Sequence, residues 1–127
     1  VAALVAQRYL LTGRALPELR VYVIWEPAQG HDEREAAVKA AALLNDDPRV
    51  TQFWSRSRFA GRAFREPLGF ASAAAWDVFL LFAPGSRWTV EAPPIALSMN
   101  NRSQDPSQHL EAKVLAAKVR DLMPGAR

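Results

Sequence analysis

Residues 78–82 read Val-Phe-Leu-Leu-Phe, five apolar residues that are followed by the turn-forming pair Pro84-Gly85. A short apolar run that contains aromatic residues and is bounded by a turn is typical of a buried strand. We therefore predict a strand over residues 78–82 that is covered on both faces. A further short strand is predicted over residues 95–99, and the two strands are compatible with an antiparallel hairpin that has a long loop.

A similar apolar segment lies earlier in the chain, where residues 19–25 read Leu-Arg-Val-Tyr-Val-Ile-Trp. Successive side chains of a strand point to opposite faces, so apolar residues would occupy both faces here. One face would hold Val21, Val23 and Trp25, and the other would hold Tyr22 and Ile24. We predict an interior strand that is covered on both sides, as in parallel sheets.

Three helices are predicted from capping signals and apolar spacing. The first covers residues 1–11, and the second covers residues 33–44 with Asp32 as its N-cap and Glu35 and Lys39 as a surface ion pair. The last opens at Asp105-Pro106. The core-facing positions would be Val38, Ala41 and Leu44 in the second helix, and Leu110, Val114, Leu115, Val119 and Leu122 in the last.

Residues 47–64 are also predicted to be helical. Asp47-Pro48 is a good N-cap and first-turn pair for a short helix that would carry Val50, Phe53 and Trp54. Helical turns are expected to continue through Phe64, and residues 66–69 are expected to form a loop.

The composition limits the classes of function that the chain can have. Its 127 residues fit one domain, which is expected to span residues 1–127. There is no cysteine, so the chain has no thiolate nucleophile, disulfide or zinc–cysteine cluster. No apolar run reaches the roughly 18 residues that a transmembrane helix needs, and no signal peptide is recognised. The net charge of +3 is weak support for a nucleic-acid partner, which is not expected.

The predicted order is helix, strand, helix, short helix, strand, strand, helix, which describes a three-layer α/β sandwich. This order resembles a thioredoxin fold without its first strand. Specific stretches are also similar to a group of bacterial thioredoxin-like proteins. These stretches are Val23-Ile24-Trp25-Glu26-Pro27, Asp47-Pro48-Arg49-Val50 with Phe53-Trp54, and Trp76-Asp77-Val78-Phe79-Leu80-Leu81-Phe82.

The resemblance implies a redox pair, Cys-x-x-Cys, at the start of the first helix, and a cis-proline just before the third strand. The pair would lie at or upstream of Val1, and residues 73–76, Ala-Ala-Ala-Trp, lack the proline. A missing central strand would leave residues 19–25 and 78–82 with unpaired edges, which cost about 1 to 3 kcal/mol per buried backbone group. We therefore expect this chain to be a fragment of a longer protein.

Candidate ligand-binding residues are Trp25, Glu26, Asp32 and Trp76. The first three lie at or after the carboxyl end of a predicted strand, where open α/β sheets place their sites. Glu26 could carry a proton or anchor a polar group, with Trp25 as a wall. The alternative is structural: Trp25 in the core, Glu26 a solvated loop residue and Asp32 a helix cap.

Two further clusters have simpler explanations. His31, Asp32 and Glu35 could ligate a metal, but helix capping explains them and no metal is expected. Four arginines accompany Phe59 and Phe64, a mixture that suits phosphate or single-stranded nucleic acid. A solvated face is favoured there, because the phenylalanines could fill the core. The arginines are Arg56, Arg58, Arg62 and Arg65.

Two functions are expected from this sequence. In the first, the full-length protein is a thiol-disulfide oxidoreductase that acts on a protein or peptide thiol, with no catalytic residue and no cofactor in these 127 residues. In the alternative, the domain is a redox-inactive thioredoxin-fold binding module. A groove near Trp25, Glu26 and Trp76 would then hold a peptide or small ligand.

Overall fold

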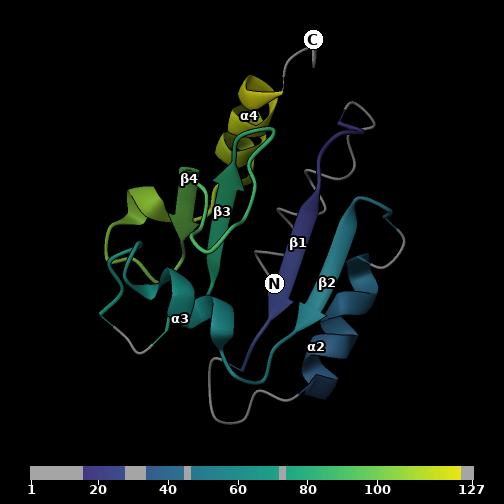
Figure 1. Cartoon of the computed structure of the whole chain (residues 1–127), viewed down its shortest axis with the longest axis vertical. Helices are drawn as coiled ribbons and strands as arrows, with labels where there is room; N and C mark the ends of the chain where they lie inside the picture. Colours follow the sequence, from purple (N-terminus) through teal and green to yellow (C-terminus); the bar gives the residue numbers. More distant parts are fainter. Residues whose placement is uncertain (1–15, 28–33, 45–46, 72–73, 124–127) are drawn as a thin grey trace. The chain divides into compact units, whose positions relative to one another are not determined.

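The computed structural model describes residues 16–27, 34–44, 47–71 and 74–123 (Figure 1). These residues belong to two compact units, Leu16–Trp76 and the part that follows from Asp77. The first unit has the order strand, helix, strand, helix, and the second has the order strand, strand, helix. The chain is therefore an α/β protein. The helix predicted over residues 1–11 lies outside the described residues.

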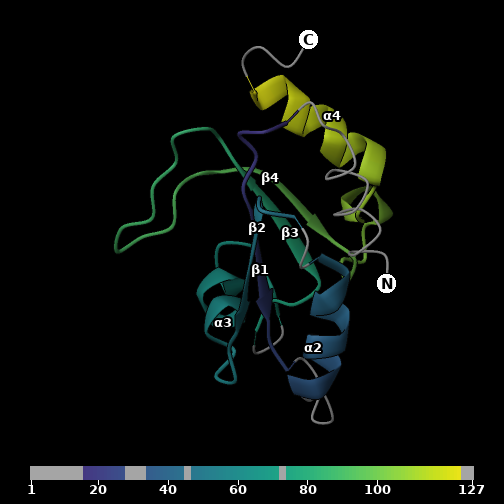
Figure 2. The ribbon, with the colours of Figure 1, turned by 90° about the vertical axis from the view of Figure 1, so that its right-hand side faces the viewer.

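The first unit is built on a pair of parallel strands. Strand β1 (Val21–Trp25) pairs with β2 (Val50–Trp54) in a register that runs from Val21 opposite Val50 to Trp25 opposite Trp54. The connection contains helix α2 (Arg34–Ala41), which continues as the 3-10 turn η1 (Ala42–Leu44). Helix α3 (Phe59–Arg65) follows β2, and Figure 2 shows α2 and α3 on opposite sides of the strand pair.

Strand β2 corrects the prediction of a helix over this segment. Val-Thr-Gln-Phe-Trp is rich in β-branched and aromatic residues, and its alternate side chains Thr51 and Phe53 are exposed while the others are half-buried. This alternation and the pairing with β1 outweigh the local Asp-Pro signal, which the structure uses in a turn. Residues 21–25 pair with β2 along one edge.

One face of the strand pair is more deeply buried than the other. Val23 points into the core of the unit with only 8% of its surface exposed. Tyr22, Ile24 and Phe53 share the opposite face, since residues in register on parallel strands point the same way, and they are 66%, 47% and 49% exposed. The expectation that β1 is covered on both sides is therefore wrong for this face.

Helix α2 confirms the predicted helix and its surface ion pair. Lys39 Nζ lies 2.9 Å from Glu35 Oε1 on the exposed side. Leu44 is buried as predicted, but Val38 is exposed, because the helix turns Ala37, Ala41 and Leu44 inward instead. The predicted cap Asp32 lies outside the described residues.

The second unit begins with the predicted hairpin. Strand β3 (Val78–Phe82) pairs antiparallel with β4 (Ile95–Asn100), and the register shifts between Leu81 and Phe82. The long connection stands away from the strands in Figure 2. Phe82 contacts Trp88 of this connection edge to face, with ring centroids 5.7 Å apart. All five side chains of β3 are half-buried, so both faces of this strand are partly covered and neither is fully buried as predicted.

The C-terminal helix begins later than predicted. Asp105 and Pro106 open only the 3-10 turn η2 (Pro106–Gln108), where Asp105 Oδ1 accepts a hydrogen bond from the Ser107 N–H at 2.9 Å. Helix α4 (Ala112–Leu122) follows and buries Leu115, Ala116 and Val119, whereas Val114 is 46% exposed, contrary to prediction. Within the described ranges, no helix is long and apolar enough to cross a membrane.

Candidate functional site

Glu26 directly follows β1, and its carboxylate caps helix α3. Oε1 accepts a hydrogen bond from the Ala60 N–H, and Oε2 accepts one from the Gly61 N–H, both at 2.9 Å. The first N–H groups of a helix have no partner within it and carry partial positive charge, so a carboxylate is favoured there. Glu26 is therefore a capping residue, and the interpretation of it as a solvated loop residue is wrong.

Gly61 makes room for a third segment at this point. The Gly61 carbonyl accepts a hydrogen bond from the Ala75 N–H at 2.7 Å. A Cβ atom on Gly61 would lie 2.5 Å from the Ala75 carbonyl oxygen, closer than these atoms can pack, and 3.0 Å from Glu26 Oε2, which is a tight contact. The end of β1, the start of α3 and residues 74–76 thus meet around one glycine. We call this meeting point the Gly61 junction.

Trp25 belongs to the packing of the first unit. Its indole Nε1 donates a hydrogen bond to Gln52 Oε1 at 3.0 Å, and Gln52 Nε2 donates one to the Ala41 carbonyl at 3.0 Å. The amide of Gln52 thereby joins β1, β2 and the end of α2. The helix predicted over residues 47–64 does not indicate this role, because only a strand places Gln52 directly beside β1.

The structure brings some of the predicted ligand-binding residues together. Glu26 and the segment that ends in the half-buried Trp76 meet at the Gly61 junction. Trp25 is engaged with β2 by its indole, and Asp32 lies outside the described residues. Among the residues that the structure describes, no three histidine, cysteine, aspartate or glutamate side chains gather in a way that could hold a metal ion.

The four arginines accompany a phenylalanine that is not part of the core. Phe64 is buried, as the sequence suggested, but Phe59 is 71% exposed at the start of α3. The side chains of Arg56, Arg58, Arg62 and Arg65 make no ion pair with another residue in the described ranges. Arg58 precedes the helix with a left-handed backbone, φ 53°, and its side chain does not cap the helix.

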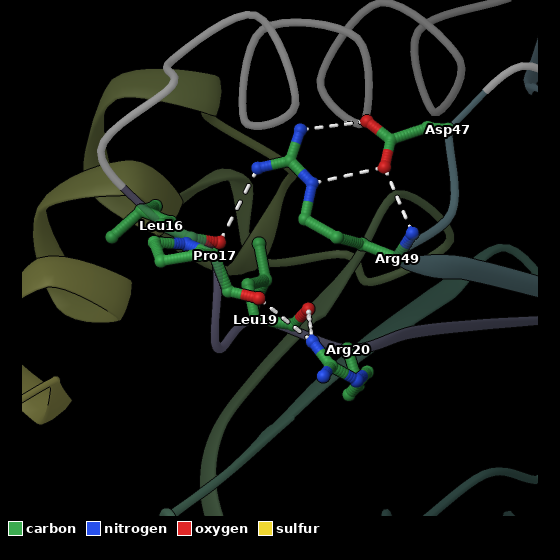
Figure 3. A network of polar contacts seen from close by, with 6 residues as sticks. All are labelled: Leu16, Pro17, Leu19, Arg20, Asp47 and Arg49. Atoms are coloured by element: carbon green, nitrogen blue, oxygen red, sulfur yellow. Dashed lines mark hydrogen bonds and ion pairs between the residues drawn. The ribbon is translucent and has the colours of Figure 1, made fainter.

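A second polar cluster lies at the opposite ends of the same strands, where β1 and β2 begin (Figure 3). Arg49 donates to both carboxylate oxygens of Asp47, at 2.9 and 2.6 Å, and to the Leu16 carbonyl at 3.3 Å. The hydrogen bond from the Arg49 side chain is the main cause that lowers the pKa of Asp47 to about 2. Close by, Arg20 donates to the Pro17 and Leu19 carbonyls. The Arg49 bond to Leu16 fastens the segment before β1 to the turn before β2, whereas the Arg20 bonds stay within the segment before β1.

Comparison with protein-family models, with curated proteins and with solved structures finds no match for this chain.

Proposed function

We propose that this chain is a redox-inactive thioredoxin-like domain that works as a peptide-binding module. The order of its elements carries the proposal. A parallel pair connected through α2, then α3, then an antiparallel hairpin and α4 make the order strand, helix, strand, helix, strand, strand, helix. This order of the described elements is the same as in a thioredoxin fold, and in our proposal β1 takes the place of its first strand.

With β1 as the first strand, the place of the redox pair moves into this chain. Thioredoxin-like proteins carry Cys-x-x-Cys at the start of the first helix, which here follows β1. Residues 26–33 of the sequence read Glu-Pro-Ala-Gln-Gly-His-Asp-Glu and contain no thiol. Without a cysteine, no thiolate can form at this helix start. This observation favours the binding module over the oxidoreductase.

The Gly61 junction indicates where on the domain the peptide would bind. Residues 74–76 lie just before β3, where the family has its cis-proline opposite the redox pair, and they are held against α3 through Gly61. Trp76 ends this segment and is half-buried, so part of its indole is accessible to an apolar side chain. We place the peptide along residues 74–76.

The fold part of the proposal is tested by nuclear magnetic resonance. A thioredoxin-like sandwich joins the two strand pairs into one sheet through β1 and β3. Backbone proton contacts between residues 21–25 and 78–82 are therefore expected in nuclear Overhauser spectra. If β1 has contacts with β2 alone, the thioredoxin-like fold is refuted, whatever the chain binds.

The binding part is tested with an unfolded polypeptide, reduced and carboxymethylated α-lactalbumin, added to the 15N-labelled protein. The Trp76 indole signal and the amide signals of Ala75 and Gly61 are expected to shift, and Trp76→Ala should weaken the binding. Trp88→Ala is the matched control, because Trp88 lies in the connection between β3 and β4. The proposal fails if no signal shifts, or if the two substitutions weaken binding equally.

A further inference from the structure

We propose that the outer side of α3 binds single-stranded nucleic acid, through a stripe of three arginines and the exposed ring of Phe59. This inference rests on α3 and the turn before it, and it is independent of the peptide site at the Gly61 junction. The four residues that carry it are Arg58, Phe59, Arg62 and Arg65.

The arginines are spaced to form one row. Arg58, Arg62 and Arg65 stand at positions i, i+4 and i+7, which lie above one another on a helix. Arg58 precedes the helix as its N-cap residue, is half-buried, and joins the helix through its carbonyl, which accepts the Arg62 N–H at 3.0 Å. Neighbouring cations in such a row are about 5–6 Å apart at their Cβ atoms, within reach of successive phosphates of an extended strand.

The three arginines of this row form no ion pair in the described part of the protein, although Glu66 stands four residues after Arg62. By contrast, Arg49 in the same unit is bound to Asp47. Two carboxylates lie near the helix. Glu66 follows its last residue, and Glu26 is bound to the amides of Ala60 and Gly61. Gly61 lies on the buried side of α3 and flanks the row, three residues after Arg58 and four before Arg65.

Phe59 gives the row an aromatic platform. It is 71% exposed, and it stands three residues before Arg62, so its ring and that guanidinium are neighbours on the solvent side. Phe64 is the large apolar side chain on the buried side of α3. Packing in the core therefore does not explain why a phenylalanine occupies position 59. An exposed ring beside arginines is the combination that stacks on unpaired bases while cations hold the phosphates.

The backbone of Arg58 adds an independent observation. A non-glycine residue at φ 53° is strained by about 1–2 kcal/mol, and the side chain does not repay this by capping the helix. A glycine would adopt this conformation more easily. The presence of an arginine is explained if its guanidinium holds a ligand.

Other anionic partners fit the surface less well. An acidic peptide would use the arginines but has no base to stack on Phe59. An anionic membrane needs a broad apolar face for insertion, and α3 has seven residues with one large exposed apolar side chain. A nucleic-acid duplex keeps its bases stacked and leaves the ring without a partner.

Fluorescence anisotropy with a labelled oligothymidylate of about 20 nucleotides tests the proposal. Binding is expected at about 50 mM salt, and with three phosphate contacts the affinity should fall by about 20-fold at about 200 mM salt. The triple variant R58Q/R62Q/R65Q should abolish this salt-dependent binding, and F59A should weaken binding by about 5-fold or more.

A matched triple variant, R34Q/R87Q/R120Q, removes equal charge from exposed positions on other elements and should retain most of the affinity. R58G separates binding from folding, since it should weaken binding while the melting temperature does not fall. The proposal is overturned if no binding occurs at low salt, if the two triple variants weaken it equally, or if F59A has no effect. Equal binding of a duplex, of polyglutamate or of phosphatidylserine vesicles also overturns it.

Discussion

The carboxylate of Glu26 accepts the backbone N–H of Gly61 at 2.9 Å, so a residue at the end of β1 caps a helix that begins more than thirty residues later. The second oxygen accepts the N–H of Ala60 in the same way. Arg58, which occupies the usual N-cap position, gives no side-chain hydrogen bond to the helix. The start of α3 therefore depends on a residue that is remote in sequence.

Replacing Glu26 by alanine should lower the free energy of unfolding by about 1.5–3 kcal/mol, because two helix N–H groups lose a charged acceptor. Glu26→Gln keeps one acceptor oxygen and should have a smaller effect. Urea denaturation measures both, with Glu66→Ala as the control on an exposed glutamate beside the same helix. A loss for Glu66→Ala as large as that for Glu26→Ala would contradict the capping role.

Gly61→Ala should destabilise the protein by about 1–3 kcal/mol, because the new methyl group would lie 2.5 Å from the Ala75 carbonyl oxygen. Helix propensity alone predicts the opposite sign, a gain of about 1 kcal/mol. The sign of the change in urea denaturation therefore decides whether the close approach exists. A more stable Gly61→Ala variant would show that residues 74–76 do not pack against α3.

The ion pair of Asp47 with Arg49 should make stability depend on pH. The pKa of Asp47 is lowered to about 2 in the folded protein, so its contribution is present above the ordinary pKa and is lost as the pH falls toward 2. At about pH 7, Asp47→Asn should cost about 1–2 kcal/mol. Denaturation at several pH values should show this difference between the two proteins shrinking below about pH 4. A difference that stays constant with pH would rule out the proposed contribution.

Arg58→Gly should raise the free energy of unfolding by about 1 kcal/mol, because glycine adopts a φ of 53° without the clash of a Cβ atom. Arg58→Ala is the comparison, since it removes the same charge and keeps the clash. Thermal denaturation of the two variants isolates the backbone effect. Equal melting temperatures would mean that the left-handed conformation is not maintained in solution.

The sequence predicted most strands and helices from local patterns. Residues 78–82 and 95–99 form the expected hairpin, and Glu35 and Lys39 form the expected pair on α2. These features depend on short-range apolar spacing and on contacts one helical turn apart. Residues 50–54 were misread because an Asp-Pro pair opens turns as well as helices, and partner strands cannot be seen locally.

The site was predicted less completely than the fold. Glu26 is a ligand-binding candidate in the sequence, whereas its capping role depends on amides that are distant in sequence and carry no side-chain signal. Gly61 was not singled out, because a glycine in a helical segment does not reveal which backbone approaches it. The exposure of Phe59 was missed for a related reason: two phenylalanines five residues apart cannot be assigned to core and surface before the helix is placed.

The remote cap on α3 has a consequence for the order of folding. An isolated helix of seven residues is not stable in water, because nucleation is unfavourable and few hydrogen bonds follow it. Since its acceptor comes from the end of β1, α3 should acquire lasting structure only after that strand has docked on its parallel neighbour. The hairpin of β3 and β4 pairs strands that follow one another in sequence and needs no such crossover, so we expect amide protons of α3 to become protected from exchange later than those of the hairpin.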